Sequence, residues 1–149
     1  FIAGTGELRE KLEAMAERYG ISDKVHFLGF LPDEQLKQAY ADCDIFVLPS
    51  VVKSEAFGIV QLEAMIYGKP VINTALPSGV PYVSIHGETG LTVAPDDPKA
   101  LAKAVIRLAS DRDMRERFGN AAKERVMEHF CEEAVIRRLY EVLKGGAEI

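Results

Sequence analysis

The chain has 149 residues, of which 48% are hydrophobic and 28% charged, a balance typical of a soluble globular protein rather than a disordered or fibrous one. The formal net charge of -5 argues against nucleic acid or an anionic membrane as the main partner, because both favour basic surfaces. No apolar run approaches the about 20 residues of a membrane-spanning helix, and no signal-peptide pattern is seen. We therefore expect a cytoplasmic chain whose length suits one domain.

Short apolar runs alternate with helical periodicity from the start of the chain. The segment FIAG predicts a strand, and because the chain begins inside it without a methionine, we expect the sequence to be part of a larger protein. Apolar side chains at helical spacing then predict a helix that ends at Gly20. The segment VHFLGF predicts the next strand, and PDEQLKQAYADC predicts the next helix, with Asp33 as its N-cap.

The alternation continues through the middle of the chain and then stops. The segment DIFVLPS predicts a strand buried on both faces of a parallel sheet. A helix from about Gly58 to Tyr67 follows, and then KPVINTA and GLTVAP predict two more strands. This pattern predicts a doubly wound α/β protein with right-handed crossovers. The C-terminal third shows only helical periodicity, with helices starting near Asp97, near Asp111 and after EHFCEE.

In open α/β sheets, ligands bind outside the carboxyl ends of the strands. Four loops are expected at that edge: residues 4–6, 29–32, 49–58 and 74–81. Gly4 and Gly6 follow a strand and precede a helix, which allows close approach of the backbone to a ligand. The alternative is a tight strand-to-helix turn. The dinucleotide fingerprint is incomplete, because Arg9 stands where its third glycine would be.

The segment SEAFGIVQLEAM places two glutamates, Glu55 and Glu63, around a Phe-Gly step. If a helix begins near Gly58, the free amides of its first turn favour a phosphate, which the glycine lets approach the backbone. Glu63 then lies about 7.5 Å along the helix axis from Gly58, at about 1.5 Å per residue. That separation suits two sugars on either side of a diphosphate, and each carboxylate can accept two hydrogen bonds from a vicinal diol.

A purely structural interpretation of these residues is the alternative. Glu55 is then a loop residue favoured by the helix dipole, and Glu63 a solvated helix residue. The apolar neighbours of Glu63 leave little polar face near it, which favours the ligand-binding interpretation. Lys53 fits an exposed loop lysine and His86 a loop residue near the same edge, and a ligand role is the alternative for each. No histidine has a partner at metal-ligand spacing, and no metal site is expected.

At this point the segment SEAFGIVQLEAM resembles the E-x7-E motif of the retaining GT-B glycosyltransferases of the group 1, or family 4, type. Four other segments follow that family's order and spacing: IAGTGELREKL, VHFLGFLPDEQLKQAYADCDIFVLPS, GKPVINT and HGETGLTVAPDDPKALAKAV. The resemblance covers residues 1–130. It implies a Rossmann-like domain, the C-terminal half of a GT-B fold truncated at its N-terminal edge, and hence one donor-binding domain over residues 1–149.

The resemblance also implies roles for individual positions. Glu55 would bind hydroxyls of the transferred sugar and is the candidate catalytic residue, and Glu63 would bind the ribose hydroxyls. The sugar and diphosphate would contact the backbone of four residues, Phe57, Gly58, Ile59 and Val60. Gly29, Phe30 and Leu31 would border the base. Residues Gly4 to Gly6 would form part of the floor of the donor cleft.

The activity implied is transfer of a sugar, with retention, from a nucleotide diphosphate sugar to a glycan or lipid-linked acceptor in polysaccharide or glycoconjugate synthesis. The donor is a substrate, and no cofactor is expected, because the helix dipole and basic side chains neutralise the leaving diphosphate. The expected partners are the nucleotide sugar, an N-terminal acceptor domain outside this chain, and a second copy at the truncated sheet edge. We expect the isolated chain to bind donor without turnover, and the parent protein to lie at the inner membrane face.

The sequence departs from the family pattern in two places. Ala56 stands where the family often has glycine, and ALPSGVPYVS replaces the loop that many members carry as Gly-Gly-x-x-Glu. The arginine and lysine that clamp the diphosphate in the family would lie upstream of Phe1. Two other functions stay open: a GT-B sugar-nucleotide epimerase, whose acid-base pair would have only Glu55 as an obvious member, and a non-catalytic nucleotide-binding module.

Overall fold

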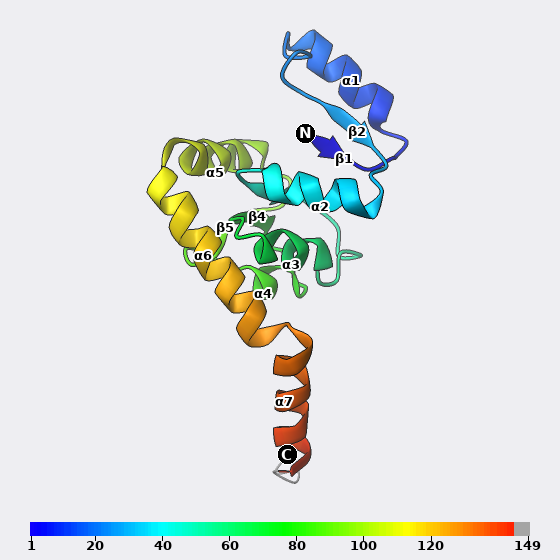
Figure 1. Cartoon of the computed structure of the whole chain (residues 1–149). Helices are drawn as coiled ribbons and strands as arrows, with labels where there is room; N and C mark the ends of the chain where they lie inside the picture. The colour runs from blue at the N-terminus through cyan, green and yellow to red at the C-terminus, as the bar shows by residue number, and fades with distance from the viewer. Residues whose placement is uncertain (145–149) are drawn as a thin grey trace. The chain divides into compact units, whose positions relative to one another are not determined.

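The computed structural model describes residues 1–144, which fall into two compact units, one from Phe1 to Ala39 and one from Tyr40 onward. In the first unit, β1 (Ile2–Ala3) and β2 (Phe27–Gly29) form a two-stranded parallel sheet and are joined by α1 (Arg9–Arg18) (Figure 1). The helix α2 (Asp33–Asp42) begins in this unit and ends in the second.

The second unit contains a parallel sheet of three strands in the order β3-β4-β5. These strands are β3 (Phe46–Leu48), β4 (Val71–Thr74) and β5 (Gly90–Val93). Helix α3 (Ile59–Ile66) connects the first two and the short α4 (Val80–Val83) the last two. Three helices follow: α5 (Pro98–Ser110), α6 (Arg112–His129) and α7 (Glu132–Lys144).

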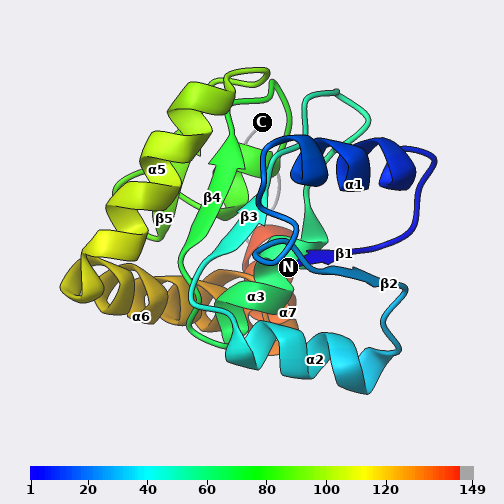
Figure 2. The same ribbon diagram turned by 90° about the horizontal axis from the view of Figure 1, so that it is seen from above.

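Both faces of the three-stranded sheet are covered. Val71 and Ile72 are neighbours in β4 and point to opposite faces, because side chains alternate along a strand. Val71 packs with side chains of α3, α4 and α6, such as Met65, whereas Ile72 packs with side chains of α5 and α6, such as Leu108. Figure 2 shows α5 on one side of the strands and α3 on the other. Two cores therefore sandwich β4, whose four residues are all buried.

The α/β class, the parallel pairing and the helical C-terminal part are all as the sequence predicted. The strands form two separate sheets, one in each unit. The prediction that the DIFVLPS strand is buried on both faces was wrong, because all three residues of β3 are only half-buried. Among the described strands β3 pairs with β4 alone, so it is an edge strand of its sheet. Helix α4 lies partly in the segment that we expected to be a loop, with Pro81 in its first turn.

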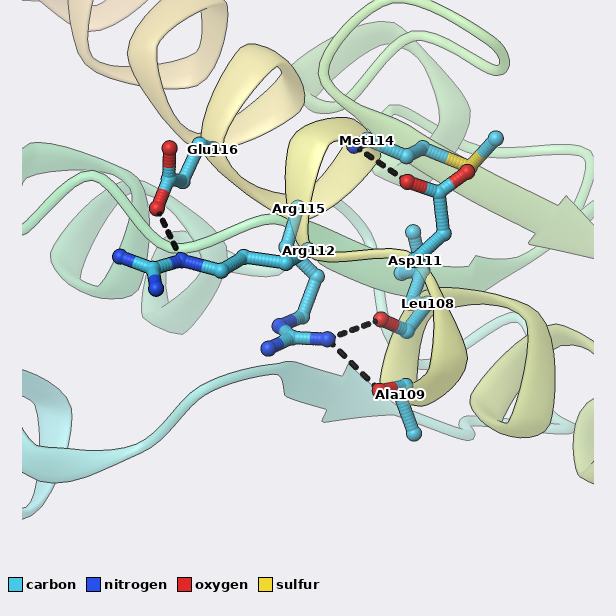
Figure 3. A network of polar contacts seen from close by, with 7 residues as sticks. All are labelled: Leu108, Ala109, Asp111, Arg112, Met114, Arg115 and Glu116. Carbon is cyan, nitrogen blue, oxygen red and sulfur yellow. Dashed lines mark hydrogen bonds and ion pairs between the residues drawn. The ribbon is translucent and has the colours of Figure 1, made fainter.

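The corner between α5 and α6 is fixed by one aspartate and one arginine (Figure 3). Asp111 is both the C-cap of α5 and the N-cap of α6, and its Oδ1 accepts a 2.8 Å hydrogen bond from the amide of Met114. Arg115 donates from Nη1 to the carbonyls of Leu108 and Ala109, each at 2.7 Å. These carbonyls end α5 and have no partner within the helix. The corner therefore supplies hydrogen-bond partners at the end of α5 and at the start of α6.

Helix α6 approaches the turn after α3 backbone to backbone. Gly119 is buried in the middle of α6, and a Cβ added to it would lie 2.0 Å from the carbonyl oxygen of Gly68. No side chain fits in that space, since non-bonded heavy atoms pack at about 3.5 to 4.0 Å. Gly119 thus lets the two elements pack closely.

Helix α7 is the least buried of the C-terminal helices. Ala134 is its one buried residue, whereas Ile136 and Leu139 are exposed by 57% each. Within residues 1–144, none of the helices combines the length and the apolar character that crossing a bilayer requires.

Candidate functional site

The start of α3 is set by Gly58, as the sequence predicted. Gly58 is the N-cap residue, with φ of 73° and ψ of 57°, a left-handed conformation that favours glycine. A Cβ at this position would lie 2.7 Å from both Gln61 Nε2 and Leu48 Cδ2. The glycine is therefore required by the backbone and by crowding on the protein side, whether or not a phosphate approaches it.

The first amides of α3 are available to a ligand. The Gln61 amide donates to the Gly58 carbonyl at 2.9 Å, whereas the amides of Ile59 and Val60 donate to no carbonyl or side chain in the described part of the chain. Unpaired amides at a helix N-terminus carry the positive end of the helix dipole and attract anions. No acidic side chain occupies this first turn. The region thus has the donors and the local charge that a phosphate group requires.

Glu55 lies immediately before this helix and is half-buried. Its amide donates to the Val52 carbonyl at 3.2 Å, but its carboxylate takes part in no hydrogen bond or ion pair with the residues that the structure describes. The backbone around it is held in place, because the amide of Gly79 donates to the Ala56 carbonyl at 2.7 Å. A fixed backbone with an unpaired carboxylate is consistent with a ligand-binding residue.

Phe57 anchors the same loop to the rest of the second unit. Its side chain packs against the core that contains Met65, and its ring meets that of Phe130 edge-on with centroids 6.1 Å apart. A Cβ on Gly79 would lie 2.7 Å from Phe57 Cδ2, so the replacement for the Gly-Gly-x-x-Glu loop still supplies a glycine where contact is close. That loop therefore supports the candidate site through packing.

Gln61 is a residue that the sequence analysis missed. It is fully buried, and its Nε2 donates to the carbonyls of Phe57 at 3.2 Å and Val80 at 3.3 Å. Its Oε1 accepts a 2.9 Å hydrogen bond from Asn73 Nδ2, which also reaches the carbonyls of Val80 and Ser84. This network ties the loop before α3 to β4 and α4. The available signal was a neutral polar side chain in a helical run whose only other polar residue is Glu63.

Glu63 lies on α3 and is exposed, so the argument from its apolar neighbours was wrong: the polar residue that faces the core is Gln61. Glu63 Oε2 accepts a 2.8 Å hydrogen bond from the hydroxyl of Tyr40. Tyr40 is only 6% exposed, and burial, together with this hydrogen bond, raises the pKa of its phenol well above the usual range. The carboxylate of Glu63 is thereby held at one oxygen and open to solvent.

The predicted residues of the first unit form a second group. Gly4 and Gly6 line a pocket of about 170 Å³ together with Arg9 and Phe27. The Gly4 amide donates to the Gly29 carbonyl at 2.7 Å, which joins the ends of β1 and β2. Phe30 is 77% exposed, and Leu31 is half-buried. Glu55, residues 57–60 and Glu63 lie in the second unit, and Gly4, Gly6, Phe30 and Leu31 lie in the first.

Other candidate groups have structural surroundings. His86 accepts a hydrogen bond at Nδ1 from the Thr92 amide at 2.9 Å, which holds a loop to β5. Lys53 is exposed. A pocket of about 250 Å³, lined in part by Pro49, Thr74 and Asp97, does not include either glutamate of the motif. In the described range of the chain, no three His, Cys, Asp or Glu side chains gather as metal ligands would.

Known proteins resemble this chain over most of its length. The family described as "Glycosyl transferases group 1" matches residues 1–125. An uncharacterised glycosyltransferase of Methanocaldococcus jannaschii is 37% identical over 148 residues, which are 99% of this chain and 37% of that protein. The D-rhamnosyltransferase WbpZ of Pseudomonas aeruginosa is 41% identical over 133 residues, covering 87% of this chain and 34% of that protein.

A solved structure agrees with these matches. Anabaena HepE in complex with UDP-glucose superposes with a TM-score of 0.81 at 27% identity, over 96% of this chain and 40% of that one. The chain spans somewhat more than a third of the length of the two curated relatives from Methanocaldococcus jannaschii and Pseudomonas aeruginosa.

Proposed function

Because the chain belongs to the group 1 glycosyltransferases, we propose that its residues 1–149 are the donor-binding domain of a retaining sugar-transfer enzyme. The donor is a nucleoside diphosphate sugar and the acceptor a glycan or lipid-linked saccharide. A polysaccharide or glycoconjugate is the product class. The observation that carries this proposal is the unpaired, half-buried carboxylate of Glu55 directly before a helix N-terminus with free amides.

Each group at the start of α3 has a chemical match in such a donor. The amides of Ile59 and Val60 suit the diphosphate, because they are unpaired donors at the positive end of the helix dipole. Glu55 accepts hydrogen bonds from hydroxyls of the sugar, and Glu63 from the ribose diol. HepE, which shares this fold, was solved with UDP-glucose bound. The assignments of Gly4, Gly6, Phe30 and Leu31 stay predictions.

Nucleotide titration tests the proposal. The ¹⁵N-labelled 149-residue chain is titrated with UDP, GDP and ADP and with their sugar conjugates, and amide shifts are followed by NMR. We expect shifts centred on residues 55–63 that favour one base, and weaker shifts at Phe30 and Leu31 if these residues contact that base. Glu63→Ala should weaken binding about tenfold or more, since it removes a charged hydrogen-bonding partner.

A matched variant distinguishes a specific loss of nucleotide binding from a general effect of removing one negative charge. Glu124 is an exposed glutamate on another helix, and Glu124→Ala should bind as the wild type does. A well-dispersed wild-type spectrum that no nucleotide changes would overturn donor binding by this chain. Equal losses in the Glu63 and Glu124 variants would remove the assignment of Glu63.

We further propose that the isolated chain binds donor without transferring sugar, since it spans somewhat more than a third of its curated relatives. A measurable transfer rate from the 149-residue chain to a saccharide acceptor would contradict this statement. In the complete enzyme, Glu55→Ala should abolish transfer. If activity survived that change, a non-catalytic binding module would explain the fold better.

A further inference from the structure

The hydroxyl of Tyr40 contacts the candidate site from outside the motif. Tyr40 lies on α2, 23 positions before Glu63 in the sequence, and its hydroxyl donates to Glu63 Oε2 at 2.8 Å. The ring is held from two sides, edge-on by Phe46 with centroids 5.7 Å apart and stacked by Tyr67 at 6.3 Å. The donor is therefore fixed in position before any ligand arrives.

The two partners differ sharply in burial. Tyr40 is 6% exposed, whereas Glu63 is exposed to solvent. A buried phenol needs a hydrogen-bond acceptor, and a neutral amide or a carbonyl would be sufficient. A carboxylate has about four lone-pair positions, of which the Tyr40 hydroxyl occupies one. The remaining positions are available on the solvent side. The contact thus orients the carboxylate without using up its capacity to accept hydrogen bonds.

Orientation of this kind affects binding. A free glutamate on a helix samples several rotamers, and ordering it on binding costs side-chain entropy. A hydrogen bond to a rigid donor incurs that cost during folding. The hydroxyl of Tyr40 is protonated, and hence a donor, throughout the neutral range, as the phenol of any tyrosine with an ordinary or raised pKa is.

We propose that Tyr40 is a positioning residue that orients Glu63 toward the ribose diol and thereby sets the preference of the site for ribonucleotides over nucleotides that lack both hydroxyls of the diol. This inference rests on the proposed function, because it needs a nucleotide at the start of α3. Tyr40 itself touches no reacting atom. Its effect is confined to interactions that involve the diol, and this limit separates positioning from a general contribution to folding.

The test compares ligands with and without the diol. The affinities of the 149-residue chain for UDP, ADP and GDP are measured by calorimetry, and the tightest is compared with its 2′,3′-dideoxy form. Tyr40→Phe should weaken ribonucleotide binding about fivefold, the equivalent of one net hydrogen bond. The affinity of Tyr40→Phe for the dideoxy form should stay within about twofold of the wild-type affinity for that form. The preference ratio, which is the affinity for the ribonucleotide divided by the affinity for its dideoxy form, therefore falls in Tyr40→Phe.

Tyr67→Phe is the matched control. Tyr67 stacks on Tyr40, is 41% exposed, and its hydroxyl makes no hydrogen bond within the described residues. Its variant should keep the wild-type preference ratio. A second measurement uses the wild type alone: the ¹³Cζ signal of Tyr40 should shift with the ribonucleotide and stay unchanged with the dideoxy form. This measurement decides the question even if Tyr40→Phe folds poorly.

The outcomes distinguish the two proposals. If wild type prefers the ribonucleotide but Tyr40→Phe keeps that preference, the positioning role is wrong and the donor site stands. An unchanged Tyr40 ¹³Cζ signal with both ligands would likewise overturn it. If the wild type binds none of the nucleotides, the proposed function fails for this chain and the inference fails with it.

Discussion

Gly58 shows how one residue without a side chain can be required twice over. Its left-handed φ of 73° strains any other residue, and its missing Cβ leaves room for Gln61 Nε2 and Leu48 Cδ2. Gly58→Ala should lower the free energy of unfolding by about 2 to 5 kcal/mol, from about 1 to 2 kcal/mol of conformational strain and about 1 to 3 kcal/mol of crowding. Urea unfolding measures the change.

Gly87 separates those two contributions. Its φ is 78°, close to that of Gly58, but no atom lies within 4 Å of an added Cβ. Gly87→Ala should therefore show the strain alone, about 1 to 2 kcal/mol. If both variants lost the same free energy, crowding at Gly58 would contribute nothing, and room for the Gln61 amide would not explain the glycine.

The buried phenol of Tyr40 predicts a stability change at alkaline pH. Its pKa is raised by burial and by its hydrogen bond to Glu63, so the unfolded chain loses this proton at about pH 10 while the folded chain keeps it. The stabilisation is complete below that pH and declines above it, by at most about 1.4 kcal/mol per pH unit. Urea unfolding between pH 9 and 11 should show this decline in wild type.

Tyr40→Phe should lack the part of the alkaline decline in the free energy of unfolding that is due to the Tyr40 phenol, and Tyr67→Phe should retain it. Burial also raises the pKa of the nearby Cys43 thiol, and its contribution is common to all three proteins, so it cancels in the comparison. Identical pH profiles for wild type and Tyr40→Phe would mean that the phenol ionises normally in the folded chain.

Sequence alone predicted the start of α3 near Gly58 correctly, because glycine is among the residues favoured at a helix N-cap. It gave the wrong reason for Glu63, which is exposed, and it missed Gln61, which is buried. Periodicity shows that a helix has a buried face. It does not show which of two polar residues lies on that face, because packing sets the rotation of the helix about its own axis. Tyr40 could not be connected to Glu63 at all.

At the scale of whole elements, the ends of helices were easier to predict from the sequence than the burial of strands. Asp97 and Asp111 both cap helices through their side chains, as their positions before helical periodicity indicated. The burial of β3 was overestimated because an apolar run does not report whether a strand is central or at an edge. Helix α4, with four residues, is too short for a periodic signal.

The α5–α6 corner predicts a capping effect. Asp111→Ala should lower the free energy of unfolding by about 1 kcal/mol, since the amide of Met114 loses its partner. Asp113→Ala is the matched control: Asp113 is an exposed aspartate in the first turn of the same helix, and its loss should cost about 0.5 kcal/mol or less. Equal changes would mean that charge, rather than the hydrogen bond, accounts for Asp111.

For the whole molecule, the sequence predicted the class of fold but not the division of the chain into two compact units. The two sheets and the boundary near Ala39 were not foreseen, because strand pairing between distant segments leaves no mark in local periodicity. The family resemblance, which carries the spacing of many segments at once, is confirmed by the match of the group 1 family to residues 1–125.

The edge of β3 predicts self-association. Phe46, Val47 and Leu48 are half-buried, and no other described strand pairs with the edge of β3 opposite β4. Unpaired backbone groups on an apolar edge strand favour pairing with another chain. We expect dimers of the 149-residue chain at high concentration, and Val47→Lys should reduce them. Light scattering across a dilution series that gave a constant monomer mass would contradict the expectation.

The contact between Gly119 and Gly68 affects how saturation mutagenesis of this protein would be interpreted. Any side chain at 119 collides with the Gly68 carbonyl, so nearly every substitution there should deplete the folded protein, as the loss of a reacting group depletes activity. A fitness map that measures growth alone would rank Gly119 beside Glu55, although only one of them lies beside the candidate site. Measuring protein abundance in parallel separates the two, because Glu55 variants should accumulate normally and Gly119 variants should not.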